Sequence, residues 1–180
     1  MTLVEMMFSV TIGLLVCGAV LATLQFSLRS FQAMTNYQKL NTQGRLALDI
    51  MSADIRQANG CSTNATFSSS SLTLSGTNVV NSLPCTINYN YNSSATTLTR
   101  TYSDTNGPQA KVLLTNLTYF NLSYFQRNPS NAVFGVFPVD TNGAAFCKAV
   151  QVDWSCSLSV LGTLFNTLNG ESAMIIIRKE

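Results

Sequence analysis

The chain begins Met1-Thr-Leu-Val-Glu5-Met-Met-Phe-Ser-Val10-Thr-Ile-Gly-Leu-Leu-Val-Cys-Gly-Ala-Val20-Leu-Ala-Thr-Leu-Gln-Phe-Ser-Leu28, and Glu5 is the only charged residue in this stretch. A membrane-spanning helix needs about 20 mostly apolar residues, and residues 6–28 meet that length. A lone acid just inside such a span is costly, so it is usually functional and usually paired. The next charged residue is Arg29, and no base lies close to Glu5 in the sequence. We therefore expect the partner of Glu5 to be another molecule or a free N-terminal amine.

A single long helix is predicted for residues 1–59, which contain no proline. At ~1.5 Å per residue this helix is roughly 88 Å long, far more than a small domain can cover. The first half is apolar all round, whereas the second half has one apolar face, made of Tyr37, Leu40, Gly44, Leu48, Met51, Ile55 and Ala58. The opposite face of the second half carries a predicted ion pair between Arg45 and Asp49. Asn59-Gly60 supplies the expected end of the helix.

After Gly60 the sequence alternates apolar and polar residues with the period of β-strands. Residues 103–109 are predicted to form a loop, and the predicted strands are residues 72–74, 120–124, 150–156, 173–177 and a hairpin of 87–91 with 96–102. Strands with one polar face favour an antiparallel sheet, packed here on the apolar face of residues 37–58. The predicted fold class is therefore α+β, with a hydrophobic protruding helix (1–28), the amphipathic half of the same helix (29–60) and a β-sheet domain (61–180).

The composition argues against several classes of function. Charged residues make up 10% of the chain and the net charge is +2, too small to predict nucleic-acid binding by bulk electrostatics. Histidine is absent, which removes most hydrolytic triads and most zinc sites. Asp104, Asp140 and Asp153 are too scattered for a catalytic pair or a calcium site. We expect neither enzymatic activity nor a cofactor or metal.

The five cysteines divide into one and four. Cys17 lies in the apolar segment and is interpreted as a small hydrophobic residue. The other four allow three disulfide pairings, of which we favour the nearest-neighbour pairing Cys61–Cys85 and Cys147–Cys156. None of the spacings is typical of a zinc ribbon or a thioredoxin site. A disulfide framework implies an oxidising compartment, the periplasm or the cell exterior.

Two motifs carry a family resemblance. Thr2-Leu3-Val4-Glu5, at the start of a long apolar helix, resembles the mature N-terminus of type IV pilins and type II secretion pseudopilins. Residues 45–58, Arg-Leu-Ala-Leu-Asp-Ile-Met-Ser-Ala-Asp-Ile-Arg-Gln-Ala, resemble the second half of that helix in the subgroup of pilus protein W and pseudopilin J. The resemblance covers residues 1 to about 60 and implies a pilin-like fold. It also implies a processed chain whose residue 1, Met1 here instead of the usual Phe, is N-methylated; the alternative is that Met1 is an initiator.

The resemblance implies that subunits stack into a helical filament, with Glu5 paired to the Met1 amine of a neighbouring subunit. The alternative is a capping carboxylate that stabilises the helix N-terminus by less than ~1 kcal/mol. As a filament core, the apolar half would pack helix against helix through Leu3, Met7, Phe8, Leu14, Leu15, Leu21, Leu24 and Phe26. As a simple membrane anchor, it would need no particular sequence.

Gly13 and Gly18 interrupt the apolar half, and each costs about 1 kcal/mol relative to alanine. They are interpreted either as sites where helices approach closely or as marks of a segment that loses helical bonding in the filament. Related pili melt near this point, often beside a proline near position 22, where this chain has Ala22.

The implied partners are other copies of the chain, the inner membrane before assembly, a prepilin peptidase/methylase, the pilus assembly machinery and other minor pilins. The implied location is the inner membrane first and an extracellular filament afterwards. A minor pilin or pseudopilin that primes the filament tip is the alternative within the family. A monomeric, membrane-anchored extracytoplasmic binding module is the alternative from a different class.

Overall fold

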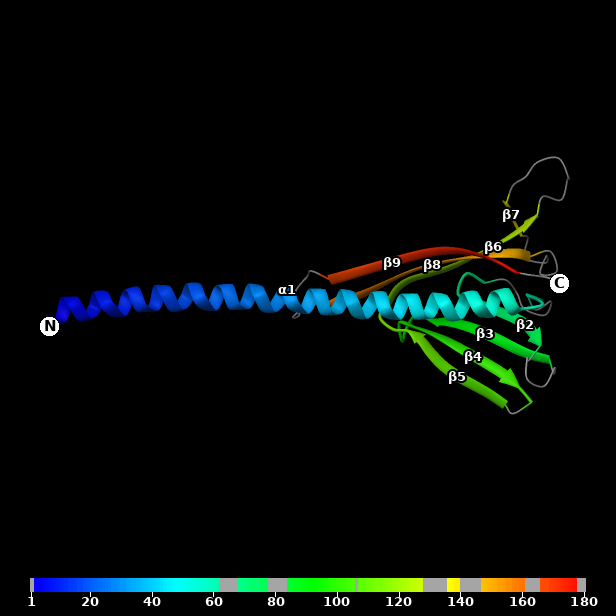
Figure 1. Ribbon diagram of the computed structural model, residues 1–180, viewed down its shortest axis with the longest axis horizontal. Coiled ribbons are helices and arrows are strands. Elements are labelled where there is room, and N and C mark those ends of the chain that lie inside the picture. Colours follow the sequence, from blue (N-terminus) through cyan, green and yellow to red (C-terminus); the bar gives the residue numbers. More distant parts are fainter. Residues whose placement is uncertain are drawn as a thin grey trace.

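The computed structural model describes residues 2–61, 68–77, 84–105, 107–127, 136–139, 147–160 and 166–177. One long helix, α1 (Leu3–Gln57), precedes a β-rich head at the far end of the molecule (Figure 1). The strands in the described part of the chain are β1 (Gly60–Cys61), β2 (Ser71–Thr77), β3 (Pro84–Asn92), β4 (Thr97–Asp104), β5 (Gly107–Leu114), β6 (Leu117–Arg127), β7 (Val136–Pro138), β8 (Cys147–Ser159) and β9 (Asn166–Ile176). The α+β class is confirmed.

Helix α1 is 55 residues long, about 82 Å at ~1.5 Å per residue. Its first turn carries Glu5 and its last turn Arg56, each with the charge that suits the helix dipole at that end. The helix ends where Ala58 turns to an extended conformation while its N–H still donates to the Asp54 carbonyl oxygen. The predicted stop at Asn59-Gly60 is therefore correct to within two residues. The predicted ion pair is wrong, because Arg45 and Asp49 make no salt bridge in the described structure.

The strands form two antiparallel sheets, whereas one sheet was predicted. The first sheet has the order β1-β2-β3-β4-β5 and the second has the order β7-β6-β8-β9. The predicted loop over residues 103–109 is also wrong, since β4 runs to Asp104 and β5 starts at Gly107. Strand β5 escaped prediction because its first six residues are not buried and so show no alternation of apolar and polar side chains.

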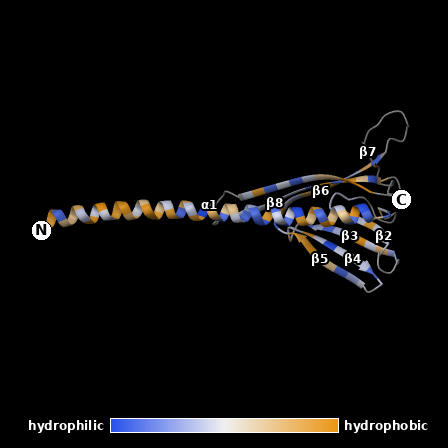
Figure 2. Cartoon of the chain, viewed as in Figure 1, coloured by the Kyte–Doolittle hydropathy of each residue, from blue (hydrophilic) through white to orange (hydrophobic). Residues whose placement is uncertain are grey.

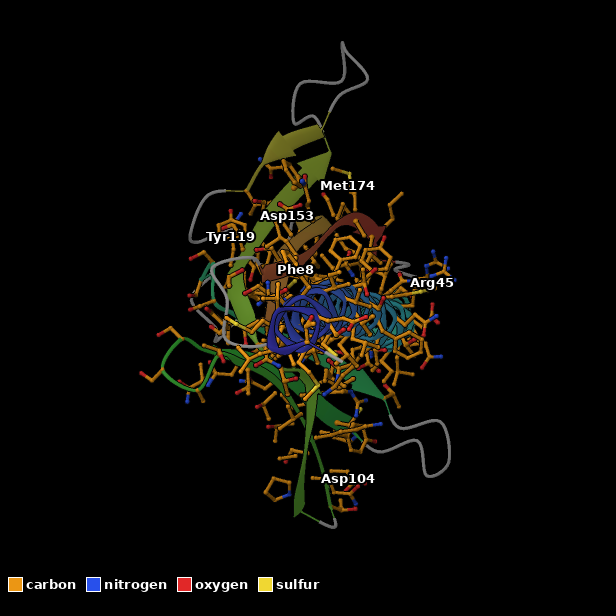
Figure 3. All side chains as sticks on the ribbon, turned by 90° about the vertical axis from the view of Figure 1, so that its left-hand side faces the viewer. Phe8, Arg45, Asp104, Tyr119, Asp153 and Met174 are labelled. Carbon is orange, nitrogen blue, oxygen red and sulfur yellow. The ribbon has the colours of Figure 1, made fainter. Side chains whose placement is uncertain are left out.

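The second half of α1 lies between the two sheets, in contact with β5, β8 and β9 (Figures 1 and 3). Its buried residues follow three- and four-residue steps: Leu40, Gly44, Ala47, Met51 and Ile55. Most of the predicted apolar face is thus confirmed, but Tyr37 is 53% exposed because it lies before the helix is fully covered. Seen from the N-terminus, Arg45 points to the open side of the helix, away from both sheets (Figure 3).

Two contacts fix how the helix enters the head. The side-chain amide of Asn36 donates to the carbonyl oxygen of Ser159, at the end of β8, over 3.2 Å. At Gly44 the helix meets β9, and a Cβ atom there would lie 2.5 Å from Oε1 of Glu171. Glycine at this position therefore leaves room for the Glu171 carboxylate against the helix.

The core contains inward-facing residues of both sheets and of the helix. In β8 the predicted alternation is confirmed, since Val150, Val152, Trp154 and Cys156 are buried. The predicted strand 173–177 exists as the end of β9, but it alternates: Ile175 is buried whereas Ile176 is exposed. One continuous core therefore joins the helix to both sheets.

We predict that replacing Met51 by alanine lowers the free energy of unfolding by about 2–5 kcal/mol, because the side chain is fully buried and its loss leaves a cavity. The matched control is Leu46→Ala on the exposed face, which should change that energy by less than about 0.5 kcal/mol. Denaturant unfolding of the full chain in detergent, followed through the single tryptophan Trp154, measures both. Equal losses for the two variants would contradict the buried face assigned here.

Candidate functional site

The first half of α1 stands clear of the head. Every residue from 2 to 31 is exposed, and Gln32 is the first that is partly covered. Figure 2 shows that hydrophobic residues dominate this half, whereas hydrophilic residues are more frequent along the covered half. A helix of this kind presents to its surroundings the surface that a soluble protein would bury.

The residues predicted to pack in a filament core all lie on this exposed half. Their side chains are between 53% and 78% exposed: Leu3, Met7, Phe8, Leu14, Leu15, Leu21, Leu24 and Phe26. Full burial of such a side chain is favourable by about 1.5–3 kcal/mol, so the eight together represent roughly 12–24 kcal/mol. The described part of the chain offers them no cover, so the cover must come from lipid or from other molecules.

The exposed half is also long enough to cross a membrane. Among the described residues, one helix, α1, has the length and apolar composition of a membrane span. At ~1.5 Å per residue, residues 2–31 extend about 45 Å, against about 30 Å for the hydrocarbon core of a bilayer. The apolar half of α1 can therefore span the hydrocarbon layer.

Three hydroxyl groups on the apolar half donate hydrogen bonds within the helix. Ser9 donates to the carbonyl oxygen of Glu5 over 2.9 Å, and Thr23 donates to that of Val20 over 2.8 Å. Thr11 donates in the same way to the carbonyl oxygen of Phe8 over 2.9 Å. Because these three hydroxyls donate within their own helix, none of the three is left unpaired on this apolar surface.

The Glu5 carboxylate lies at the start of the helix, where it accepts a hydrogen bond from the backbone N–H of Thr2 over 3.4 Å. Thr2 is the extended residue that precedes the first turn. In the single chain Glu5 thus takes the capping role, the alternative to pairing. Arg29, the next base along the helix, is 24 residues away, about 36 Å at ~1.5 Å per residue. Met1, the other half of the predicted assembly pair, lies outside the described residues.

Gly13 and Gly18 leave two bare positions on the helix surface. A Cβ atom added at either one would meet nothing within 4 Å. The helix runs unbroken through both glycines in the single chain. Melting of this segment concerns the filament and stays a prediction. Cys17, beside Gly18, is exposed like its neighbours.

The fold brings neither predicted disulfide pair together, and all five cysteines are thiols. Cys61 pairs with Leu74 on β2, which pairs with Ile87 on β3, so Cys61 and Cys85 are two strands and two residues apart. That separation is about 12 Å, and Cys147 and Cys156 lie nine residues apart on β8, roughly 30 Å. A disulfide needs Cα atoms within about 7 Å, so the nearest-neighbour pairing is corrected.

At the covered end of α1, Asp54 joins the helix to the first sheet. The Arg100 side chain, from β4, donates to it twice, from Nε to Oδ2 over 2.6 Å and from Nη2 to Oδ1 over 3.1 Å. The hydroxyl of Tyr89, from β3, also donates to Oδ2 of Asp54. The guanidinium lies 5.5 Å from the ring centre of Tyr102. This cluster ties the end of the helix to two neighbouring strands.

The electrostatics of the cluster favour this bonded arrangement. Burial raises the pKa of Tyr89, and the hydrogen bond to Asp54 raises it further. The same carboxylate raises the pKa of Arg100, chiefly through their hydrogen bonds. Sequence reasoning noted Asp54 as part of a motif but missed Arg100 and Tyr89. The available signal was a lone base at Arg100 in a predicted strand without another charge.

We predict that Arg100→Met lowers the free energy of unfolding by about 2–3 kcal/mol, because it leaves a largely buried carboxylate without its charged donor. Asp54→Asn should have a similar effect. The double variant should lose less than the sum of the two, with a coupling of about 0.5–3 kcal/mol. Denaturant unfolding measures all three, and Asp49→Asn, on the exposed face of the same helix, is the control. Strictly additive losses would contradict a direct interaction.

The architecture is pilin-like: a long N-terminal apolar helix whose second half packs on antiparallel β-structure. Comparison of the chain with protein-family models and with curated proteins finds no match. Within the described residues, no group of three potential ligands is placed to hold a metal ion.

Proposed function

We propose that the chain is a structural subunit of a type IV pilus-like extracellular filament. The observation that carries the proposal is the exposed apolar half of α1, which has one carboxylate at its tip and which no described part of the chain covers. The motif Thr2-Leu3-Val4-Glu5 supports the choice of filament over simple anchor, because an anchor has no need of an acid. The β-rich head, which surrounds the other half of the helix, would form the outer surface.

In this account the apolar half has two environments in succession. The inner membrane covers it first, since its length matches a bilayer. Neighbouring helices cover it afterwards, and the small residues Gly13 and Gly18 allow two helices to approach closely. A prepilin peptidase/methylase prepares the N-terminus, and assembly machinery moves the subunit from one environment to the other.

Glu5 sets the register of this stack. In the single chain its carboxylate makes only a long hydrogen bond to Thr2, so it is available to a stronger partner. The Met1 amine of a neighbouring subunit supplies a full positive charge, whereas helix capping contributes less than ~1 kcal/mol. Once such a pair is buried, removing one partner costs about 3–5 kcal/mol, because a charge is left uncompensated. That cost would disfavour stacks in any other axial position.

The role within the filament has two versions. A shaft subunit repeats along the filament, whereas a minor subunit primes the tip, with other minor pilins as partners. Residues 45–58, which resemble pilus protein W and pseudopilin J, favour the minor role. The head has no proposed catalytic role in either version, and we propose no cofactor.

We predict that Glu5→Gln abolishes incorporation of the chain into filaments, because the amide keeps the shape of the side chain but cannot neutralise an amine. The test shears surface material from cells that express the variant and follows the chain by microscopy and immunoblotting. Asp49→Asn, which removes an exposed carboxylate from the same helix, is the matched control and should assemble normally.

Three outcomes separate the alternatives. A chain that dominates sheared filaments is a shaft subunit, and a chain present in traces on which filament formation depends is a minor one. A wild-type chain that stays entirely with the membranes is an anchored binding module. Normal assembly of Glu5→Gln would remove the proposed pairing.

A further inference from the structure

Cys61 lies on the inner face of the first sheet, directly after the helix. It pairs with Leu74 of β2, which is fully buried, and residues paired across neighbouring strands share a face of the sheet. The Cys61 side chain is 6% exposed. Strand β1, at the edge of the first sheet, contacts β8 of the second sheet.

A β-bulge turns Cys147 to the inner face of the second sheet. Tyr124 of β6 pairs with Val150, and both are buried, so the inner face at the next paired position along β6 belongs to Gln126. A regular ladder would place Lys148 opposite Gln126. The register shift between Phe125 and Gln126 places Cys147 there instead.

The two thiols meet where the sheets meet. Cys61 and Cys147 both belong to the buried core, Cys147 is 4% exposed, and the strands that carry them, β1 and β8, are in contact. Tyr124 belongs to the same core, and burial raises its pKa, with the two thiols adding to this effect. The Tyr124 hydroxyl hydrogen-bonds to the carbonyl oxygens of Ser68 and Ser71, over 3.0 and 2.9 Å, and so ties the entry of β2 to this place.

The two thiols differ in pKa. The neighbouring Cys147 raises the pKa of Cys61, and burial raises it further. The neighbouring Cys61 lowers the pKa of Cys147, whereas burial acts in the opposite direction.

We propose that Cys61 and Cys147 form a disulfide that joins the two sheets, and that Cys85 and Cys156 stay thiols. This inference rests on the extracytoplasmic location of the proposed function, where disulfides form and persist. Cys85 lies beside Tyr102, and Cys156 lies near Glu171 of β9, so neither shares the site of the proposed pair.

The reaction is thiol–disulfide exchange with a disulfide-bearing oxidant. The thiolate of one cysteine attacks one sulfur of the oxidant, whose S–S bond breaks and releases its other sulfur as a thiolate. The second cysteine then loses its proton, attacks Sγ of the first and expels the remaining oxidant sulfur. The two cysteines lose two protons and two electrons, and the oxidant becomes a dithiol. Because both thiols are buried in the folded head, the exchange takes place while the sheets are closing on each other.

The disulfide would close a loop of residues 61–147, which contains the six strands from β2 to β7. Closing so long a loop removes much of the freedom of the unfolded chain. It also connects the residue just after the helix to the second sheet, and so holds the helix between the two sheets. Rupture of the core contacts alone would then not separate the sheets.

The test refolds the full, reduced chain in detergent with glutathione disulfide. Because this oxidant is added in vitro, the result does not depend on where the protein resides in the cell. Alkylation of the remaining thiols under denaturing conditions should label three of the five cysteines. Non-reducing peptide mapping should give one cross-linked product that joins Cys61 to Cys147. The midpoint of thermal unfolding should fall on the order of 10 °C when a reductant is added.

Four variants provide the controls. Cys61→Ala and Cys147→Ala should each abolish the effect of the reductant on the unfolding midpoint, and their double variant should be no less stable than the weaker single variant. Cys85→Ala should keep the cross-link and the reductant effect. The wild-type map needs no variant, so the test survives if a variant fails to fold.

A cross-link between any other two cysteines, or five labelled thiols after refolding with the oxidant, would overturn the pairing. The same labelling of chain isolated from cells without reductant tests the location separately. If that chain carries five thiols but forms the Cys61–Cys147 bond in vitro, the pairing stands and the proposed extracytoplasmic location fails.

Discussion

The molecule depends on the burial of an apolar surface that the described part of its own chain leaves exposed. Helix α1 has the composition of a core helix along residues 2–31, yet every one of those residues is exposed. Its energetic demand, roughly 12–24 kcal/mol for eight side chains alone, equals or exceeds the whole stability of a typical domain. The described arrangement of the isolated chain leaves this demand unsatisfied. Lipid and neighbouring helices are the two environments that can cover this surface, and in the proposed function the subunit passes from the first to the second.

The second half of α1 is fixed between the two sheets, whereas the first half is exposed. Met51 and Ile55 are fully buried between the sheets, and Asp54 receives hydrogen bonds from Arg100 and Tyr89 on two neighbouring strands. A disulfide between Cys61 and Cys147 would add a covalent link a few residues beyond. The head therefore presents the protruding half in a fixed direction, which a regular helical stack requires of each subunit. Rigidity at one end and exposure at the other serve the same proposed function.

Local sequence patterns predicted the helix and several strands, whereas contacts between distant parts of the chain determine how these elements pair and pack. The helix was predictable because its signals are local: no proline over residues 1–59, an apolar stripe at helical spacing and a glycine stop. Strand β8 was predictable from its alternation. The division into two sheets was not, because it depends on which strands pair. Arg100 meets Asp54 over 46 residues of sequence, and a bulge at Lys148 turns Cys147 to the inner face of its sheet. Neither signal is visible in the sequence around those residues.

An electron cryomicroscopy map of the assembled material at side-chain resolution tests the proposed filament most directly. We expect a helical filament in which the apolar halves of α1 form the core. In it, the Glu5 carboxylate of each subunit lies within about 4 Å of the Met1 amine of a neighbour. A filament whose residue-5 carboxylates are distant from every neighbouring N-terminus, or a particle in which the apolar helices touch only detergent, would contradict it.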